Sequence, residues 1–429
     1  MKTLTQIAGM MQELLTEVAD RIGRESGFIQ RQRKLSGASF VQTLVFGWLA
    51  KGDSTMEELS QSAANVGVQV SRQGLDERFS EAAANFLKQM VAESVKCVLR
   101  GNSVSSAVLE RFNGVYVEDS TVVELPASLQ SVWAGCNRSA LKVSVRWELQ
   151  QGGLEQVQLQ HGREHDQHAL LHYLPTPACA LQLRDLGYFD LEALKAQADN
   201  GSYWVMRYKV GTHLFTPEAQ PIDLLHRLAQ SQTQAVDWPI LLGAEARLVC
   251  RLVAQAVSPE TLQQRRKELK DWQHKHQQQA SPTKWALLGW DIYLTNAPLD
   301  LLSTSEVFEV AHVRWQIELL FKLWKSEGLL DVWRTDNPWR ILCEVYAKLI
   351  AVIIQHWLIL MGEGHNLSKS LVQMSRTIHK KAWHLAAVLS QPQALLNALT
   401  DLHRCFSWGC RISHSASSPP TFLTLSSLS

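Results

Sequence analysis

The apolar residues of the N-terminal region recur at helical spacing. Between residue 1 and about residue 112, an apolar residue occurs every three to four positions, most clearly in Phe40–Ala50 and Ala82–Leu99. No strand-like alternation interrupts this pattern. The sequence therefore predicts a helical region over residues 1–112.

The period changes at Gly114, where strand-like alternation begins. Val115–Val117 predicts a strand that carries Glu118 and Asp119 at its end. Two more strands, joined by a turn at Gly152–Gly153, are expected at Leu141–Leu149 and around Val157 and Leu159. Three short consecutive strands predict an antiparallel meander.

A second acidic residue also follows a predicted strand. The apolar run Cys179–Leu183 leads into Asp185, and a helix is expected to continue to about Ala198. Tyr203–Lys209 then predicts another strand, which contains Arg207. Asp185 would thus lie at the C-terminal edge of a sheet, where open sheets commonly bind ligands. The alternative is that Asp185 only caps the next helix.

Residues 210 to about 300 have the pattern of an insertion. Ala246–Val253 and Trp285–Thr295 predict strands, and the polar run Gln263–Gln279 predicts an exposed helix or loop. Beyond it the chain is expected to be helical to about residue 411. Tyr346–Leu360 is apolar nearly all round, so it should be a buried helix.

One predicted helix, His312–Asp331, carries charges beside its apolar stripe. At roughly 100° per residue, Arg314, Glu318 and Lys325 fall within about 40° of one another. A helix that lines a cleft would carry functional residues there. Alternatively, Arg314 and Glu318 form an ordinary surface pair at i,i+4 spacing.

Composition limits the classes of function. The chain has 429 residues, with 42 basic and 41 acidic side chains, so DNA could be bound only through local patches. Seven cysteines without a CxxC pair indicate reduced thiols rather than disulfides. The acidic, amphipathic N-terminus does not resemble a signal peptide, and Leu349–Met361 is too short to span a bilayer. These features predict a soluble intracellular protein.

A helix-turn-helix is a candidate for the N-terminal region. Ser54 or Thr55 would cap its first helix, which Gly67 would end, and Ser71 would cap the second. Arg72, Gln73 and Arg78 would then face outward, as reading of a DNA major groove requires. A plain helical hairpin is the alternative.

His161–His168 is a candidate metal cluster that the context argues against. His161, Glu164 and His165 match H-x-x-E-H, a motif that places both histidines on one face of a helix. Gly162 and the preceding strand instead favour a polar loop.

Three carboxylates remain in positions typical of a metal site. Asp119 and Asp185 follow strands, and Glu318 lies on a later helix. The order of elements is that of a ribonuclease H-like fold, in which such acids meet. Carboxylate oxygens suit Mg²⁺, and two ions can promote phosphodiester cleavage.

The motifs around these acids resemble those of bacterial insertion-sequence transposases, family four. Arg314, Glu318 and Lys325 match the spacing of the family signature Y-x2-R-x3-E-x6-K. Asp119-Ser-Thr and Asp185-Leu-Gly-Tyr-Phe resemble its two earlier acidic motifs, and the resemblance covers roughly residues 35–360.

The resemblance implies roles for particular residues. Asp119, Asp185 and Glu318 would form a DDE triad that binds two Mg²⁺ (or Mn²⁺) ions. Arg314 and Lys325 would contact phosphates at the transposon end, and Arg207 would do likewise. In relatives an aromatic of the insertion stacks on a flipped base, and Trp285 and Trp290 are the candidates here.

One position departs from the signature. Its tyrosine should fall at residue 311, where this chain has Ala311. The family's tyrosine helps to hold a terminal phosphate, so the positioning of the DNA end and a hairpin step are both in question. His312 lies about 100° further round the helix, so it is expected to be a poor substitute.

The expected fold is α/β, a ribonuclease H-like catalytic core interrupted by a mostly β insertion. The expected domains are 1–112 (helical, DNA-binding), 113–210 with 300–360 (core), 211–299 (insertion), 361–412 (C-terminal helical region) and 413–429 (disordered tail). The resemblance implies a cut-and-paste DNA transposase that acts as a homodimer on double-stranded DNA in the cytoplasm, associated with the nucleoid. A nonspecific metal-dependent nuclease and a decayed or domesticated DNA-binding protein are the alternatives.

Overall fold

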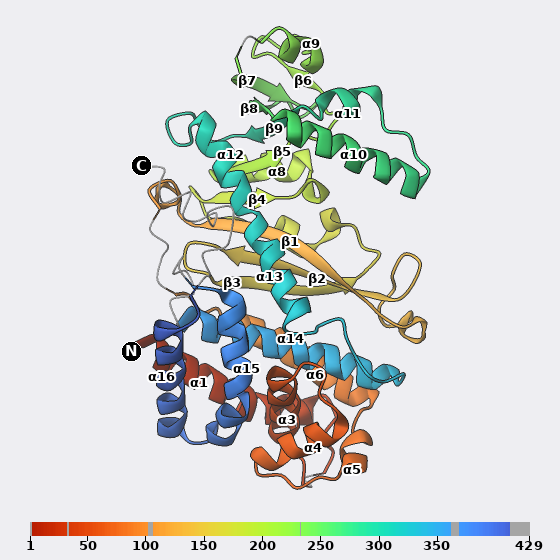
Figure 1. Cartoon of the computed structure of the whole chain (residues 1–429), viewed down its shortest axis with the longest axis vertical. Coiled ribbons are helices and arrows are strands. Elements are labelled where there is room, and N and C mark those ends of the chain that lie inside the picture. Colours follow the sequence, from red (N-terminus) through yellow and green to blue (C-terminus); the bar gives the residue numbers. More distant parts are fainter. Residues whose placement is uncertain (1, 32–33, 102–105, 232, 362–368, 412–429) are drawn as a thin grey trace. The chain divides into compact units, whose positions relative to one another are not determined.

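The computed structural model describes residues 2–31, 34–101, 106–231, 233–361 and 369–411. The described residues form two compact units. The first comprises residues 2–101, Ser120–Glu164 and 316–411; the second comprises 106–119 and His165–Trp315, within the described ranges. Figure 1 labels the helices and strands. The tail from Ser413, which the sequence predicts to be disordered, lies outside the described residues.

Helices form the N-terminal part of the first unit, which confirms the prediction from apolar spacing. They are α1 (Lys2–Glu13), the π-helical η1 (Leu14–Val18), α2 (Ala19–Glu25), α3 (Gly37–Ala50), α4 (Met56–Asn65), α5 (Arg72–Asp76) and α6 (Glu81–Lys96). Ser36, Thr55 and Ser80 begin α3, α4 and α6, because their side chains accept backbone N–H groups of the first turn. The apolar α3 is largely buried and packs against later helices of the same unit.

The C-terminal part of the first unit is also helical, as expected. Its helices are α13 (Trp315–Ser326, in this unit from Gln316), α14 (Pro338–Met361), α15 (Leu371–Val388) and α16 (Pro392–Trp408). α14 packs against α3 and α6, and α16 packs against α1 and α15.

α14 is buried from Ile341 to Met361, so the predicted buried helix is confirmed. By length and composition it could cross a membrane, but its apolar stretch is entirely buried inside the protein. An ion pair lies within it, since Lys348 Nζ is 2.8 Å from Glu344 Oε1. Burial lowers the pKa of Lys348 and raises the pKa of Glu344. Lys348 also donates to the carbonyls of Leu329 and Val332, at 3.0 and 2.6 Å.

Strands of the first unit follow the order β3-β2-β1. β2 (Ala140–Glu148) and β3 (Leu154–His161) pair antiparallel around the predicted Gly152–Gly153 turn. β1 (Val115–Glu124) enters this unit at Ser120. Every residue of β2 is buried, including the polar ones.

The sheet of the second unit continues from the first half of β1. Its order is β1-β4-β5-β9-β8-β7-β6. The strands are β4 (Leu181–Arg184), β5 (Tyr203–Arg207), β6 (Leu214–Phe215), β7 (Ala235–Leu242), β8 (Leu248–Ala256) and β9 (Trp290–Thr295). β1, β4 and β5 are parallel, and the others pair antiparallel (Figure 1).

Helices and short turns connect these strands. They are η2 (Leu109–Arg111), η4 (Asp166–His168), α7 (Leu170–Tyr173), η5 (Leu186–Tyr188), α8 (Leu191–Asp199), α9 (Leu224–Ala229), α10 (Pro259–His276), α11 (Pro282–Leu287) and α12 (Thr304–Val313); η3 (Ala127–Leu129) belongs to the first unit. α8 and α12 both pack against β5. The core of the unit gathers around Trp204, Leu252 and Leu294.

The insertion is mixed rather than mostly β. α10 alone spans 18 residues, and it is the exposed polar helix that the sequence predicts at Gln263–Gln279. The strand predicted from Trp285 begins only at Trp290, because Ser281 and Pro282 start α11 there. Serine followed by proline is a strong helix start, and it outweighs the strand-like apolar run.

Candidate active site

Asp119 and Asp185 lie next to each other on parallel strands. Glu118 of β1 is the register partner of Arg184, the last residue of β4; Asp119 follows Glu118 within β1, and Asp185 directly follows the end of β4. Both acids are half-buried. The prediction that Asp119 lies at the end of its strand is wrong. β1 continues to Glu124, because the residues after Asp119 are rich in β-branched side chains.

Asp185 does not cap the helical turn that follows it. Its backbone is extended, and within this part of the described chain its side chain makes no capping hydrogen bond to η5. Helix α8 is capped instead by Asp190, whose carboxylate accepts from the N–H groups of Glu192 and Ala193 at 2.8 and 3.1 Å. The capping role considered for Asp185 therefore belongs to another residue.

Arg314 binds the first acid directly. Its Nη1 lies 3.2 Å from Asp119 Oδ2. Arg314 separates α12 from α13, so the single helix predicted for this segment is interrupted at that residue. The arginine is thus partner to a carboxylate of its own unit, and not only half of a local i,i+4 pair.

A pocket with a volume of about 170 Å³ lies within the second unit beside Asp185. Arg207, which is exposed at the end of β5, and Arg314 also line it. The ends of β4 and β5 contribute consecutive residues to its wall, namely 183–185 and 205–207. Arg207 Cζ lies 5.8 Å from the centre of the Tyr293 ring.

Ala311 and His312 line this same pocket. His312 thus shares a pocket with the position of the signature tyrosine, and the expectation that it is a poor substitute stays a prediction. A pocket collects residues from more than 100° of a helix surface, so neighbours at i and i+1 can share it. His312 Nδ1 is 2.7 Å from the carbonyl of Phe308, to which it donates.

Trp315 is another pocket residue that sequence reasoning missed. Its side chain is 55% exposed, although large apolar residues are usually covered. Of the two tryptophans proposed for base stacking, Trp290 packs against the hydrophobic core, and Trp285 is half-buried on α11. The signal available in the sequence was an aromatic residue directly after Arg314.

Glu318 and Lys325 both lie on α13, in the first unit. Glu318 is half-buried in the first turn of the helix. Lys325 Nζ donates to the carbonyl of Val122 at 2.9 Å. The helix ends at Ser326, earlier than predicted, because Leu329 has φ +47° and a side chain at Gly328 would lie 2.6 Å from the Trp324 carbonyl.

The donor set fits a hard divalent cation in part. Asp119 and Asp185 offer carboxylate oxygens from adjacent strands, the ligands that Mg²⁺ prefers. Mg²⁺ is usually held by one or two carboxylates together with water and substrate phosphates. Over the described ranges, no group of three or more His, Cys, Asp or Glu side chains is close enough to hold a metal, and this includes His161–His168. The three-acid site therefore stays a prediction.

The candidate helix-turn-helix has a very short second helix. Thr55 and Ser71 cap α4 and α5 as predicted, and Arg72 and Gln73 are exposed. α5 is only five residues long, so Arg78 lies beyond its end and not on its outer face. A hollow of about 710 Å³ beside it is lined by residues that include Lys34 and Arg78.

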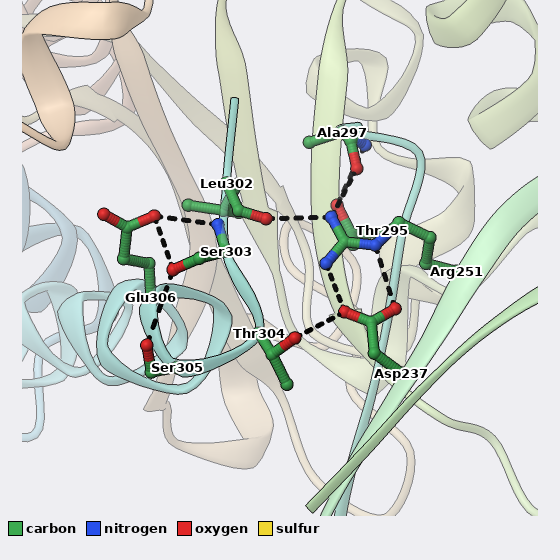
Figure 2. Close-up of polar contacts among 9 residues, drawn as sticks. All are labelled: Asp237, Arg251, Thr295, Ala297, Leu302, Ser303, Thr304, Ser305 and Glu306. Atoms are coloured by element: carbon green, nitrogen blue, oxygen red, sulfur yellow. Dashed lines mark hydrogen bonds and ion pairs between the residues drawn. The ribbon is translucent and has the colours of Figure 1, made fainter. Parts of the chain in front are cut away.

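The loop before α12 is held by a cluster that we call the loop clamp: Asp237, Arg251, Thr304 and the carbonyls of Ala297 and Leu302 (Figure 2). Arg251 donates to both carbonyls at 2.8 Å and forms an ion pair with Asp237. Thr304 donates to the same aspartate at 2.8 Å. Arg251 thereby joins the insertion to the start of α12.

Comparison with known proteins places this geometry in a family. Residues 110–354 match the transposase DDE domain family, and the chain belongs to that family. The transposase for insertion sequence element IS231C of Bacillus thuringiensis subsp. berliner is 29% identical over 373 residues, which cover 80% of this chain and 77% of that protein. The transposase for IS1151 of Clostridium perfringens is 25% identical over 382 residues, which cover 80% and 78%.

Proposed function

We propose that this protein is an insertion-sequence transposase of family four that moves its element by cutting and pasting double-stranded DNA. The observation that supports this most is the pair of acids Asp119 and Asp185 on adjacent parallel strands, with Arg314 bound to the first. The pair occurs inside the segment that matches the transposase DDE domain family. The curated relatives are named as transposases of insertion sequences.

In this proposal the three acids hold two divalent cations, Mg²⁺ or Mn²⁺, in a ribonuclease H-like core. Asp119 and Asp185 contribute from the strands and Glu318 from α13. When bound, such cations activate the attacking oxygen and stabilise the leaving oxygen of a phosphodiester. The protein orients the DNA so that water attacks first at the element's end, and the freed 3′-hydroxyl then attacks the target strand.

Cationic residues position the DNA backbone in this proposal. Arg207 and Arg314 line the pocket beside Asp185, where a phosphate would neutralise them. Lys325 would exchange its bond to the Val122 carbonyl for a phosphate oxygen. His312 lines the same pocket as Ala311, so we propose that it meets the terminal phosphate in place of the signature tyrosine.

The remaining parts have supporting roles. The helical region 1–112 would recognise the terminal inverted repeats, with Arg72 and Gln73 exposed for contact. A homodimer would pair the two transposon ends, and Trp285 would be the stacking aromatic of the insertion. The protein would work in the cytoplasm, associated with the nucleoid.

Cleavage of terminal-repeat DNA tests the proposal. Purified protein with Mg²⁺ should cut at the element boundary, and Asp119→Ala, Asp185→Ala and Glu318→Ala should each abolish cutting because the cations lose a ligand. Asp199→Asn is the matched control, since this acid is 63% exposed on α8 and pairs with Lys195 one turn away. Full activity of all three alanine variants would reject the proposal.

Two other outcomes identify the alternatives. Specific binding of the terminal repeat without any metal-dependent cutting indicates a decayed DNA-binding protein. Cutting without preference for the repeat, which persists when residues 1–112 are deleted, indicates a nonspecific nuclease.

A further inference from the structure

Glu118 and Arg184 form a buried ion pair at the last rung of the β1–β4 ladder. Arg184 Nε lies 2.7 Å from Glu118 Oε2, and the side chains are 2% and 0% exposed. They are also register partners and the final pair of that ladder. Asp119 and Asp185 follow them directly, so this ion pair is the last cross-strand link before the two acids.

Neighbouring groups fix the pair in one geometry. Gln182 Nε2 donates to Glu118 Oε1 at 2.7 Å. Arg184 donates through Nη2 to the His172 carbonyl at 3.0 Å, and its Nη1 lies 3.2 Å from His172 Nδ1. An arginine can only donate, so this imidazole nitrogen is the acceptor and the ring is neutral. The guanidinium is therefore held at both of its ends.

The ion pair and the two acids belong to opposite faces of the sheet. Successive side chains of a strand alternate between faces, so Glu118 and Asp119 point to different sides, as do Arg184 and Asp185. Gln182 and Arg184 share the face of Glu118, in agreement with their hydrogen bonds. Arg184 nevertheless contributes to the lining of the pocket beside Asp185, whereas Glu118 does not line it.

A buried ion pair is a weak source of stability, because desolvation offsets most of the attraction between the charges. It is a strong determinant of register. If β4 slipped by one residue against β1, Arg184 would move to the other face, and two buried charges would lose their partners. The same slip would carry Asp185 away from Asp119.

We infer that Glu118 and Arg184 are positioning residues, which lock the β1–β4 register and so keep Asp119 and Asp185 side by side. The use of the two acids in metal binding rests on the proposed function. Their alignment does not, and it can be measured without metal, DNA or catalysis.

Thiol cross-linking measures the alignment in the full chain. Residues at adjacent positions on neighbouring strands are within disulfide reach. In an Asp119→Cys/Asp185→Cys chain, mild oxidation should join the two introduced thiols, as read by mass spectrometry of non-reduced peptides. The parent chain, with its seven free cysteines, gives the background.

Adding Glu118→Gln should slow this cross-link by about tenfold or more, the usual scale of positioning effects at metal sites. Glu344→Gln is the matched control, because it removes the carboxylate of another deeply buried ion pair, in α14. It should lower the melting temperature without slowing the cross-link. Equal cross-linking rates in the double-cysteine chain and in its Glu118→Gln and Glu344→Gln derivatives would overturn the inference.

A double substitution separates positioning from folding. Glu118→Leu/Arg184→Leu leaves no unpaired buried charge, so the protein should keep its circular dichroism spectrum and cooperative melting. When combined with Asp119→Cys/Asp185→Cys, it should still cross-link about tenfold more slowly than the chain that carries only these two cysteine substitutions. A folded double variant with the parental rate would contradict a positioning role.

Cleavage of terminal-repeat DNA then connects the alignment to function. With the two aspartates intact, the double variant should cut about tenfold more slowly and require more Mg²⁺ than the parent. Parental cutting at parental Mg²⁺ would overturn the inference. If the parent itself does not cut, the proposed function fails, while the cross-linking rates still decide whether the pair sets the register.

Discussion

Two groups of charged residues on the sheet of the second unit differ in their surroundings. One group binds other groups of the protein, and the other lines a pocket. In the loop clamp, Arg251 binds Asp237 and two backbone carbonyls, and Asp237 also accepts from Thr304. Beside β4, Asp185 and Arg207 instead line a pocket of about 170 Å³. Charges that are satisfied inside the protein fix the backbone, whereas charges that line a pocket can meet a ligand. An ion pair in a sheet therefore indicates a ligand-binding role only when its surroundings leave room for a ligand.

Breaking the loop clamp should have the largest effect on stability. Arg251→Met removes the donor to Asp237 and to the carbonyls of Ala297 and Leu302, all in a mostly buried site. Loss of one partner of a buried pair costs about 3 kcal/mol, so the free energy of unfolding in urea should fall by that amount. Arg266→Met, on the exposed side of α10, is the control and should change it by less than about 0.5 kcal/mol. Equal effects would mean that the clamp is only a surface feature.

Removing a pocket charge should affect DNA binding and not folding. Arg207 is exposed, so Arg207→Gln should leave the melting temperature unchanged. Loss of one phosphate contact should weaken binding of terminal-repeat DNA, and the slope of log affinity against log salt should become shallower by about one. Lys195→Gln, exposed on α8, should change neither quantity. An unchanged slope for Arg207→Gln would place this arginine outside the DNA contact.

The buried histidine behind the acids should give a smaller effect, visible only in acid. Burial, together with the charge of Arg184, lowers the pKa of His172 from 6.5 to about 4. The unfolded chain therefore binds a proton between these pH values that the folded chain excludes, so stability should fall as pH decreases from 6.5 towards 4. His172→Gln should flatten this part of the pH–stability curve. The same slope in both proteins would show that another group is responsible.

The sequence predicts the strands that carry the acids because their short apolar runs end at chemically distinct residues. It also predicts the capping of α4 at Thr55, which depends on neighbours three residues away. It does not predict the break at Arg314, where the side chain pairs with the distant Asp119. The helix end at Ser326 was predicted too late, although Gly328 is a residue type that often ends helices. The place of His312 in the pocket was not predicted, because helical angle alone does not define a pocket.

The ion pair of Glu118 and Arg184 shows the same limit. Each residue could be read as a charge next to a strand end, and only the parallel register brings them together across 66 residues of chain (184−118). A charged residue inside an otherwise apolar strand was the available signal, since isolated charges are seldom buried. The partner could not be identified without the pairing of the strands.

The ion pair inside α14 has a consequence for synthesis of the protein. Before the first unit folds, the ribosome releases a 24-residue segment whose length and hydropathy suit a membrane span. Lys348 lies near the middle of that segment, where a lysine opposes insertion by about 2.5–3.5 kcal/mol. The same lysine can be buried in the folded protein because the Glu344 carboxylate and two backbone carbonyls accept hydrogen bonds from its ammonium group. A charge that adds little to the folded core therefore opposes insertion of the nascent helix into a membrane.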